Sequence, residues 1–126
     1  MGRFSTTVME HFQDPQNRGR LECAGHFGVV GTPGRGMFFI MALNIENDIV
    51  LDARFDCNGC GASVASGSVL TSMIRGRSVA ECQGLVSDDL LTKLDGLPVD
   101  KRHCAANAIT ALQRAITGQV DGEGNT

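Results

Sequence analysis

The chain has 126 residues, of which 42% are hydrophobic and 20% charged, and its formal net charge is −3. These values are typical of one globular domain, and an acidic chain without a basic patch is not expected to bind nucleic acid. No apolar run is long enough to span a bilayer, and no secretory signal pattern is present. We therefore expect no membrane contact and a cytoplasmic protein whose five cysteines stay mostly reduced.

The first predicted helix covers residues 5–12. Phe4, Val8 and Phe12 recur there at the spacing of one helix face, and a serine and a threonine are available to cap the helix. A Gly-rich stretch follows, for which we predict a loop that carries Arg35.

Two strands are predicted next, over residues 37–45 and 49–57. Residues 46–48 between them have the composition of a hairpin turn. Alternation in the second run predicts a half-buried strand, with four side chains on one face: Ile49, Leu51, Ala53 and Phe55.

The remainder reads as helices. Residues 62–75 form a predicted helix with unusually small side chains, which would let a sheet or another helix pack very close. Residues 78–81 have the form of a capping box and open a short helix. Further helices are predicted over residues 87–94 and 103–117.

Four residues in two separate segments could hold a metal. Cys57, Cys60, His103 and Cys104 supply three thiolates and an imidazole, a full tetrahedral ligand set. Cys60 and Cys104 are both predicted at helix starts, where the helix dipole favours thiolate over thiol. A metal or cluster site is therefore the favoured interpretation of these four residues.

The other cysteines and histidines have simpler interpretations. Cys23 and Cys82 are predicted to be small buried side chains, and His11 and His26 to be structural. A rival hypothesis for the Cys-x-x-Cys motif is thiol redox chemistry. No βαβ unit precedes the motif, which argues against a thioredoxin-like fold but leaves a reversible disulfide open.

Three ordered segments resemble a known family. Residues 10–19 (EHFQDPQNRG) are similar to the motif H-[FY]-x-x-P-x-N-x-G, and residues 59–66 (GCGASVAS) to G-C-G-S-A-I-A-S. Residues 96–104 (GLPVDKRHC) are similar to G-L-P-P-x-K-x-H-C-S. The chain thus resembles the NifU/IscU-type scaffold proteins of iron–sulfur cluster assembly, over nearly its whole length.

The resemblance implies a fold and a role. The fold would be α+β and SufE/NifU-like, with a small antiparallel sheet of about three strands packed against several helices. One NifU-like N-terminal-type scaffold domain would cover residues 1–120, with a disordered tail at residues 121–126. The protein would be a scaffold rather than an enzyme, and it would bind iron or a [2Fe–2S] cluster transiently. Its partners would be a cysteine desulfurase and apo-protein acceptors.

The resemblance also assigns residues. Cys60, Cys104 and His103 match family ligands, and Lys101 matches a lysine beside them. Arg35 stands at the position of a lost cysteine ligand.

Two further positions depart from the family pattern. Met37 replaces the aspartate that serves the family in keeping its cluster labile, so that with Arg35 the local charge becomes more positive by about two units. The chaperone-recognition pattern L-P-P-V-K is imperfect at residues 97–101, which counts against chaperone binding.

Three arrangements of the site remain open. Cys57 could complete a Cys₃His set for a [2Fe–2S] cluster or zinc. A partner protein could instead supply the missing ligands to Cys60, His103 and Cys104. Alternatively, Arg35 could lie against the thiolates as a counter-ion, with no metal bound. The corresponding alternatives to a scaffold are a zinc-binding or metal-free regulatory relative and a redox protein using Cys57 and Cys60.

Overall fold

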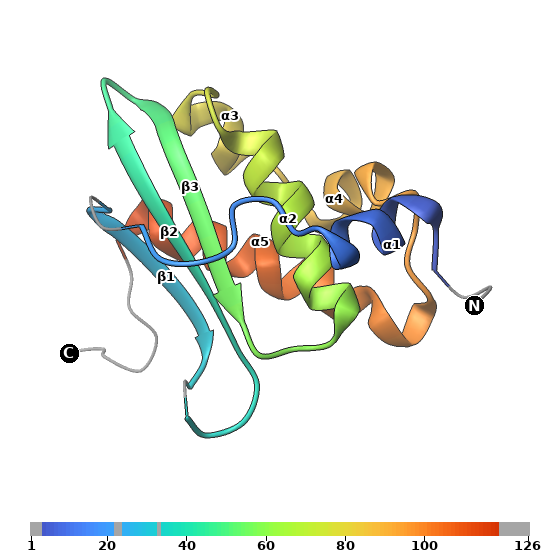
Figure 1. Cartoon of the computed structure of the whole chain (residues 1–126). Helices are drawn as coiled ribbons and strands as arrows, with labels where there is room; N and C mark the ends of the chain where they lie inside the picture. Colours follow the sequence, from blue (N-terminus) through green and yellow to red (C-terminus); the bar gives the residue numbers. More distant parts are fainter. Residues whose placement is uncertain (1–3, 22–23, 33, 119–126) are drawn as a thin grey trace.

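The computed structural model describes residues 4–21, 24–32 and 34–118. A three-stranded antiparallel sheet forms one side of the molecule, and the helices pack together on its other side (Figure 1). The predicted α+β class is confirmed. The predicted tail and Cys23 lie outside the described residues.

The sheet has the strand order β1-β2-β3. Its strands are β1 (His26–Gly31), β2 (Phe38–Glu46) and β3 (Ile49–Cys57). The two strands predicted from alternation are confirmed to within one residue. β1 was not predicted from alternation, because glycines at positions 28 and 31 interrupt its apolar pattern.

The hairpin between β2 and β3 turns on two residues, Asn47 and Asp48, which have φ angles of 53° and 63°. Both residue types tolerate this left-handed region, and two such residues in succession suit a tight hairpin. A register shift lies just before this turn, between Asn44 and Ile45 of β2. It leaves Leu51 47% exposed and Val50 buried, so the predicted common face of Leu51 and Phe55 is wrong.

The helices also follow the predicted positions closely. Ser5 caps the first helix by accepting a hydrogen bond from the Val8 amide, and Ser78 and Glu81 form the predicted capping box. The helical segments are α1 (Thr6–Gln13), α2 (Gly61–Ile74), α3 (Val79–Gln83), α4 (Ser87–Lys93), the 3₁₀ turn η1 (Val99–Lys101) and α5 (Arg102–Thr117).

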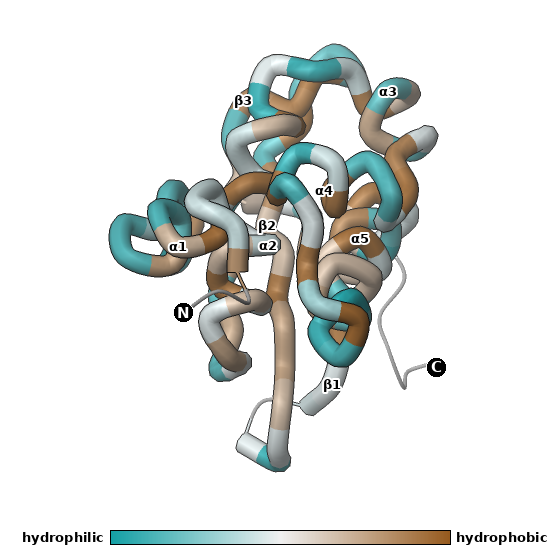
Figure 2. The backbone as a smooth tube through the Cα atoms, turned by 90° about the vertical axis from the view of Figure 1, so that its right-hand side faces the viewer, coloured by the Kyte–Doolittle hydropathy of each residue, from teal (hydrophilic) through white to brown (hydrophobic). Residues whose placement is uncertain are grey.

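Helix α2 is the centre of the molecule. All residues from 62 to 71 are buried, because the helix contacts β3, α1, α4 and α5. A Cβ atom added at Gly67 would lie 2.3 Å from the ring of Phe55. The prediction that small side chains on this helix permit close packing is confirmed. Helices α4 and α5 instead alternate hydrophobic and hydrophilic segments along their length (Figure 2).

A second close approach joins β1 to α5. A Cβ at Gly28 would overlap the carbonyl oxygen of Ala111 and the amide of Ala115. Arg114 reinforces this contact by donating a hydrogen bond to the Val29 carbonyl at 2.7 Å. With α5 held on the sheet and against α2, the first turn of α5 lies beside the start of α2.

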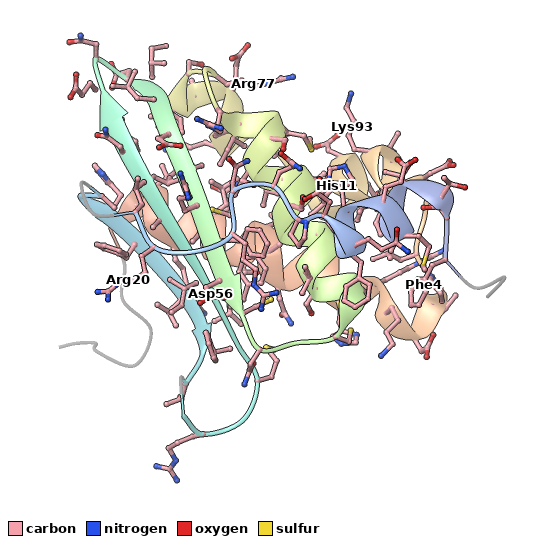
Figure 3. All side chains as sticks on the ribbon, in the orientation of Figure 1. Phe4, His11, Arg20, Asp56, Arg77 and Lys93 are labelled. Atoms are coloured by element: carbon pink, nitrogen blue, oxygen red, sulfur yellow. The ribbon has the colours of Figure 1, made fainter. Side chains whose placement is uncertain are left out.

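The segment after α1 is held by α2 as well. His11 points from α1 toward α2, where its Nδ1 lies 2.6 Å from the Ser68 hydroxyl (Figure 3). The same hydroxyl accepts a hydrogen bond from the Gln16 amide. These contacts give His11 the structural role predicted for it. None of the described helices is both long and apolar enough to cross a membrane.

Candidate thiol and metal site

Three chain connections converge at one end of the molecule. They are the β1–β2 loop, the connection from β3 to α2, and the connection from α4 through η1 to α5 (Figure 1). Cys60 is the N-cap residue of α2, and Cys104 lies in the first turn of α5. Both predicted placements at helix starts are confirmed.

The fold brings these two thiols into contact. The Sγ atoms of Cys60 and Cys104 lie 3.9 Å apart, although the residues are 44 positions apart in sequence. His103 Nε2 lies 3.7 Å from the Cys104 sulfur. Cys60 and His103 are exposed, whereas Cys104 is 2% exposed. The three retained family positions therefore form one chain of contacts that opens to solvent.

The surroundings of Cys60 favour its thiolate. Burial is the largest influence and by itself raises the pKa of this thiol. The backbone amides of Ser63 and Ala62 donate hydrogen bonds to the sulfur and oppose that effect. The hydrogen bond with the Cys104 thiol and the positive charge of Lys101 also lower the pKa. Together these influences outweigh burial, so the pKa of Cys60 lies below its ordinary value.

The surroundings of Cys104 favour the protonated thiol. Burial is again the largest influence and raises the pKa. The Ser63 side chain forms a hydrogen bond that lowers the pKa, but the neighbouring Cys60 raises it, and the net shift is upward. The opposite pKa shifts of the two thiols favour a hydrogen bond from the Cys104 thiol to the Cys60 sulfur. Ser63, which contacts both sulfurs, was missed by sequence reasoning, although its position three residues after Cys60 is a typical capping position.

Cys57 occupies a different environment. It lies on the helix-facing side of β3 and is 3% exposed. Burial raises the pKa of its thiol, although the Gly59 amide donates a hydrogen bond to the sulfur and opposes the shift. The charge of Cys60 also acts on this thiol. Cys57 is thus near the site but belongs to the core, beneath the loop that carries Cys60.

Arg35 and Met37 are both exposed on the β1–β2 loop. The side chain of Asn58 attaches this loop to the Cys60 segment: its Oδ1 accepts from the Phe38 amide at 2.8 Å, and its Nδ2 donates to the Gly36 carbonyl at 2.7 Å. The loop that carries the two departures from the family pattern is therefore tied to the segment that precedes Cys60. Sequence reasoning missed Asn58, because its partners are backbone atoms more than 20 residues away.

Among the described residues, Lys101 is a cation that acts on both thiols. Within the described residues, no three His, Cys, Asp or Glu side chains are grouped closely enough to hold a metal ion. The contacts at Cys104 thus supply a partial ligand set, which a bound metal would have to complete by side-chain movement or with ligands from outside the chain.

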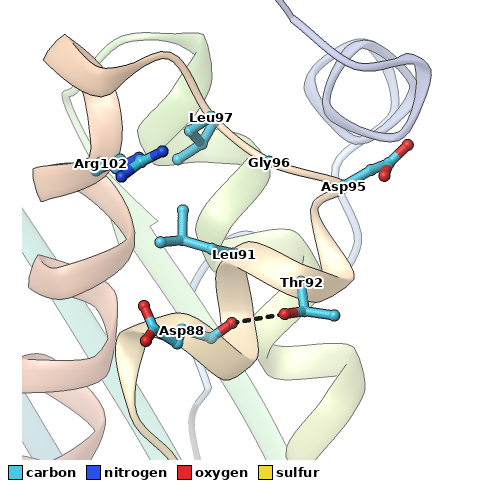
Figure 4. Close-up of a pocket in the computed structure, with 7 residues that line it drawn as sticks. All are labelled: Asp88, Leu91, Thr92, Asp95, Gly96, Leu97 and Arg102. Atoms are coloured by element: carbon cyan, nitrogen blue, oxygen red, sulfur yellow. Dashed lines mark hydrogen bonds between the residues drawn. The ribbon is translucent and has the colours of Figure 1, made fainter.

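A hollow of about 520 Å³ lies next to this end, between α4 and α5 (Figure 4). Thr92 donates a hydrogen bond to the Asp88 carbonyl on one side of it, and Arg102 lies on the other. Leu97, from the segment compared with the chaperone-recognition pattern, lines the hollow and is 7% exposed, whereas Val99 is 78% exposed. The hollow contains no thiol.

The two contacting thiols thus lie at one end of an α+β domain, with Cys60 exposed and Cys104 buried beside it. The profile described as "NifU-like N terminal domain" matches residues 3–120. The chain belongs to this family.

Individual relatives agree. The chain is 37% identical over 115 residues to the iron–sulfur cluster assembly scaffold protein IscU of Aquifex aeolicus, covering 90% of this chain and 73% of that one. It is 35% identical over 113 residues to IscU 1 of Archaeoglobus fulgidus, covering 90% and 74%. The nitrogen fixation protein NifU of Azotobacter chroococcum is 36% identical over 118 residues, which cover 92% of this chain and 38% of that longer protein.

Solved structures confirm the fold. A putative iron–sulfur cluster assembly scaffold protein from Fervidobacterium islandicum superposes with a TM-score of 0.70 at 17% identity, covering 90% of this chain and 96% of that one. The N-terminal part of a NifU-like protein from Brucella abortus gives a TM-score of 0.68 at 17% identity, covering 90% and 91%.

Proposed function

We propose that this protein is a scaffold of iron–sulfur cluster assembly that binds iron or a [2Fe–2S] cluster as transient cargo through Cys60, Cys104 and His103. The observation that carries the proposal is the 3.9 Å contact between the Cys60 and Cys104 sulfurs in a member of this family. A carrier that must give up its cargo needs accessible ligands, and Cys60 and His103 are exposed.

The electrostatics support binding of a thiophilic cation. Metals bind thiolates rather than thiols, so a thiol with a lowered pKa gives up its proton to a metal more readily. Cys60 is such a thiol. Cys104 would lose its proton on metal binding, and the Ser63 hydrogen bond would then stabilise its thiolate. Lys101 would partly neutralise the charge of a thiolate-bound cluster.

The fourth ligand decides how tightly the cargo is held. A [2Fe–2S] cluster takes four protein ligands, and this chain brings three candidates into contact, with Cys60 and His103 at the surface and Cys104 buried beside them. Cys57 would have to leave the core to become the fourth, at the cost of exposing its apolar surroundings. We therefore favour a site completed from outside the chain, by a partner protein or by solvent. Cys57 remains the internal candidate.

In the proposed cycle, a cysteine desulfurase supplies sulfur and an apo-protein accepts the finished cluster, without turnover of a small substrate. This role suits a cytoplasmic protein in which the thiols stay reduced. Arg35, on the loop tied to the Cys60 segment, has a positive charge where the family pattern has a ligand. We expect it to weaken retention of the cluster rather than to abolish binding, because Lys101 is a cation that acts on both thiols.

Cluster transfer tests the scaffold role. The protein is loaded anaerobically with iron, and a cysteine desulfurase with cysteine and a thiol reductant, which releases the persulfide sulfur as sulfide, supplies the sulfide. An apo-ferredoxin is then added, and its circular dichroism reports the cluster that it receives. Transfer that is lost in Cys60→Ser and Cys104→Ser and retained in Cys82→Ser supports the proposal. A colourless protein that transfers nothing contradicts it.

The same preparations test the alternatives. The exposed Arg35 and the incomplete ligand set favour a zinc-binding or metal-free regulatory protein as the second candidate. Zinc that is bound at one ion per chain and does not exchange would support that role. A colourless protein that cycles between dithiol and disulfide, without metal, would support a redox role.

A further inference from the structure

We propose that Cys60 and Cys104 form a reversible intramolecular disulfide by thiol–disulfide exchange with low-molecular-weight disulfides. The Cys-x-x-Cys motif of the sequence suggests a disulfide between Cys57 and Cys60, whereas the structure brings Cys60 and Cys104 together. The proposed disulfide rests on contact geometry and exposure. Only its consequence for cluster binding rests on the proposed function.

Four thiols are described: Cys57, Cys60, Cys82 and Cys104. Of these, Cys60 and Cys104 are in contact, with their sulfurs 3.9 Å apart. A disulfide requires about 2.0 Å, so the pair needs a side-chain movement of about 2 Å. Cys82 lies on α3, at the end of the molecule opposite to the start of α2 (Figure 1).

Exposure determines which thiol reacts first. Cys60 is exposed, while Cys104 is 2% and Cys57 3% exposed. A small disulfide from solvent can therefore reach Cys60 and neither buried thiol. Cys104 is buried and in contact with Cys60, so a disulfide formed on Cys60 lies within its reach. An accessible attacking thiol with a buried resolving thiol in contact is the arrangement that dithiol exchange requires.

The reaction has two balanced steps. The Cys60 thiolate attacks one sulfur of a disulfide RSSR, forming Cys60–S–S–R and releasing RS⁻. Cys104 then attacks the Cys60 sulfur, forming the Cys60–Cys104 disulfide and releasing the second RS⁻. The departing thiolates take up the protons of the two cysteines, so two thiols are oxidised by two electrons and RSSR is reduced to two RSH.

The consequence is exclusive occupancy. A Cys60–Cys104 disulfide removes both thiolates from the proposed cargo site, so the oxidised protein should bind no cluster. A bound cluster should in turn protect the pair from exchange. Loading would then depend on the ratio of thiol to disulfide around the protein.

Peptide mapping tests the pairing. The metal-free, reduced protein is incubated anaerobically with oxidised glutathione, its free thiols are alkylated, and it is digested with trypsin. Cleavage at arginines places Cys57 and Cys60 on residues 55–75, and Cys104 on residues 103–114. The inference predicts that these two peptides become linked and that reduction separates them.

Variants identify the sulfurs. The link should persist in Cys57→Ser and Cys82→Ser and be lost in Cys60→Ser. In Cys60→Ser, the peptide 103–114 should also carry no glutathione on Cys104. Cys104→Ser should stop after the first step, with one glutathione on Cys60. A peptide 55–75 that loses two hydrogen atoms without a link would show a Cys57–Cys60 disulfide and overturn the inference, as would a wild-type protein that carries only mixed disulfides.

Reconstitution with iron and sulfide separates this inference from the proposed function. Cluster binding by the reduced protein without any link after oxidation would overturn the disulfide alone. A link formed in a protein that never binds iron would overturn the scaffold role alone.

Discussion

Gly67 gives a quantitative test of how the fold positions Cys60. The residue lies in the middle of α2, and an added Cβ would be 2.3 Å from the ring of Phe55, a side chain that is 1% exposed. Real Cβ atoms do not approach so closely, so Gly67→Ala must displace α2 or the β3 side chain. Overpacking of this kind costs about 1–3 kcal/mol. Alanine is intrinsically better than glycine in a helix by about 1 kcal/mol, which offsets part of the cost.

The net expectation for Gly67→Ala is a loss of up to about 2 kcal/mol. In urea unfolding, with a slope of about 1–3 kcal/mol per molar for a small domain, a loss of about 2 kcal/mol lowers the midpoint by about 0.7–2 M. Gly84→Ala is the matched control, because its added Cβ meets its nearest atom at an ordinary 3.6 Å. Its midpoint should stay the same or rise. A Gly67→Ala midpoint equal to or above that of the control would refute the argument that α2 packs at its limit.

Four further predictions concern the site and its thiols. Asn58→Ala removes two exposed hydrogen bonds and should cost about 1–2 kcal/mol, with faster hydrogen exchange at the Phe38 amide; unchanged exchange would show that the loop is held otherwise. Lys101→Gln should raise the pKa of Cys60, because a nearby cation favours the thiolate, and iodoacetamide should then alkylate Cys60 more slowly at neutral pH; an unshifted pH profile would contradict this. Arg35→Cys restores a family ligand position and should increase the iron and sulfide retained after desalting, whereas equal retention would show that this loop does not reach the cluster. The buried thiols have raised pKa values, so above the ordinary thiol pKa the folded protein holds more protons than the unfolded chain, and its free energy of unfolding should fall with rising pH; a flat profile in urea titrations would contradict those directions.

Local signals in the sequence were sufficient for most elements. The hairpin, the capping box and the small side chains of α2 are each encoded within a few neighbouring residues, and the structure has all three. Strand β1 was not predicted because Gly28 interrupts its apolar pattern. A glycine is needed there because the backbone of α5 packs against it, a long-range contact that the local sequence does not reveal. The predicted face of Leu51 was wrong because a register shift between β2 and β3 depends on the pairing with the partner strand, which the alternation within one strand does not contain.

The sequence predicted only part of the site. Helix-start positions for Cys60 and Cys104 could be predicted from local patterns, and the match to family motifs put both in one site. Their contact depends on α5 lying against α2, a long-range packing result. The burial of Cys57 depends on which face of β3 meets the helices, and alternation alone does not specify that face. The contacts of Ser63 and Asn58 depend on the same convergence of chain connections.

The most direct test of the central claim is the amount of iron and acid-labile sulfide bound per chain after anaerobic reconstitution and desalting. The measurement compares the wild-type protein with Cys60→Ser, Cys104→Ser and the control Cys82→Ser, which changes a buried thiol on α3. If Cys60 and Cys104 hold the cargo, both site variants lose the iron and sulfide that the wild type and the control retain. Equal iron and sulfide in all four proteins, or none in the wild type, would contradict a cluster scaffold built on these two thiols.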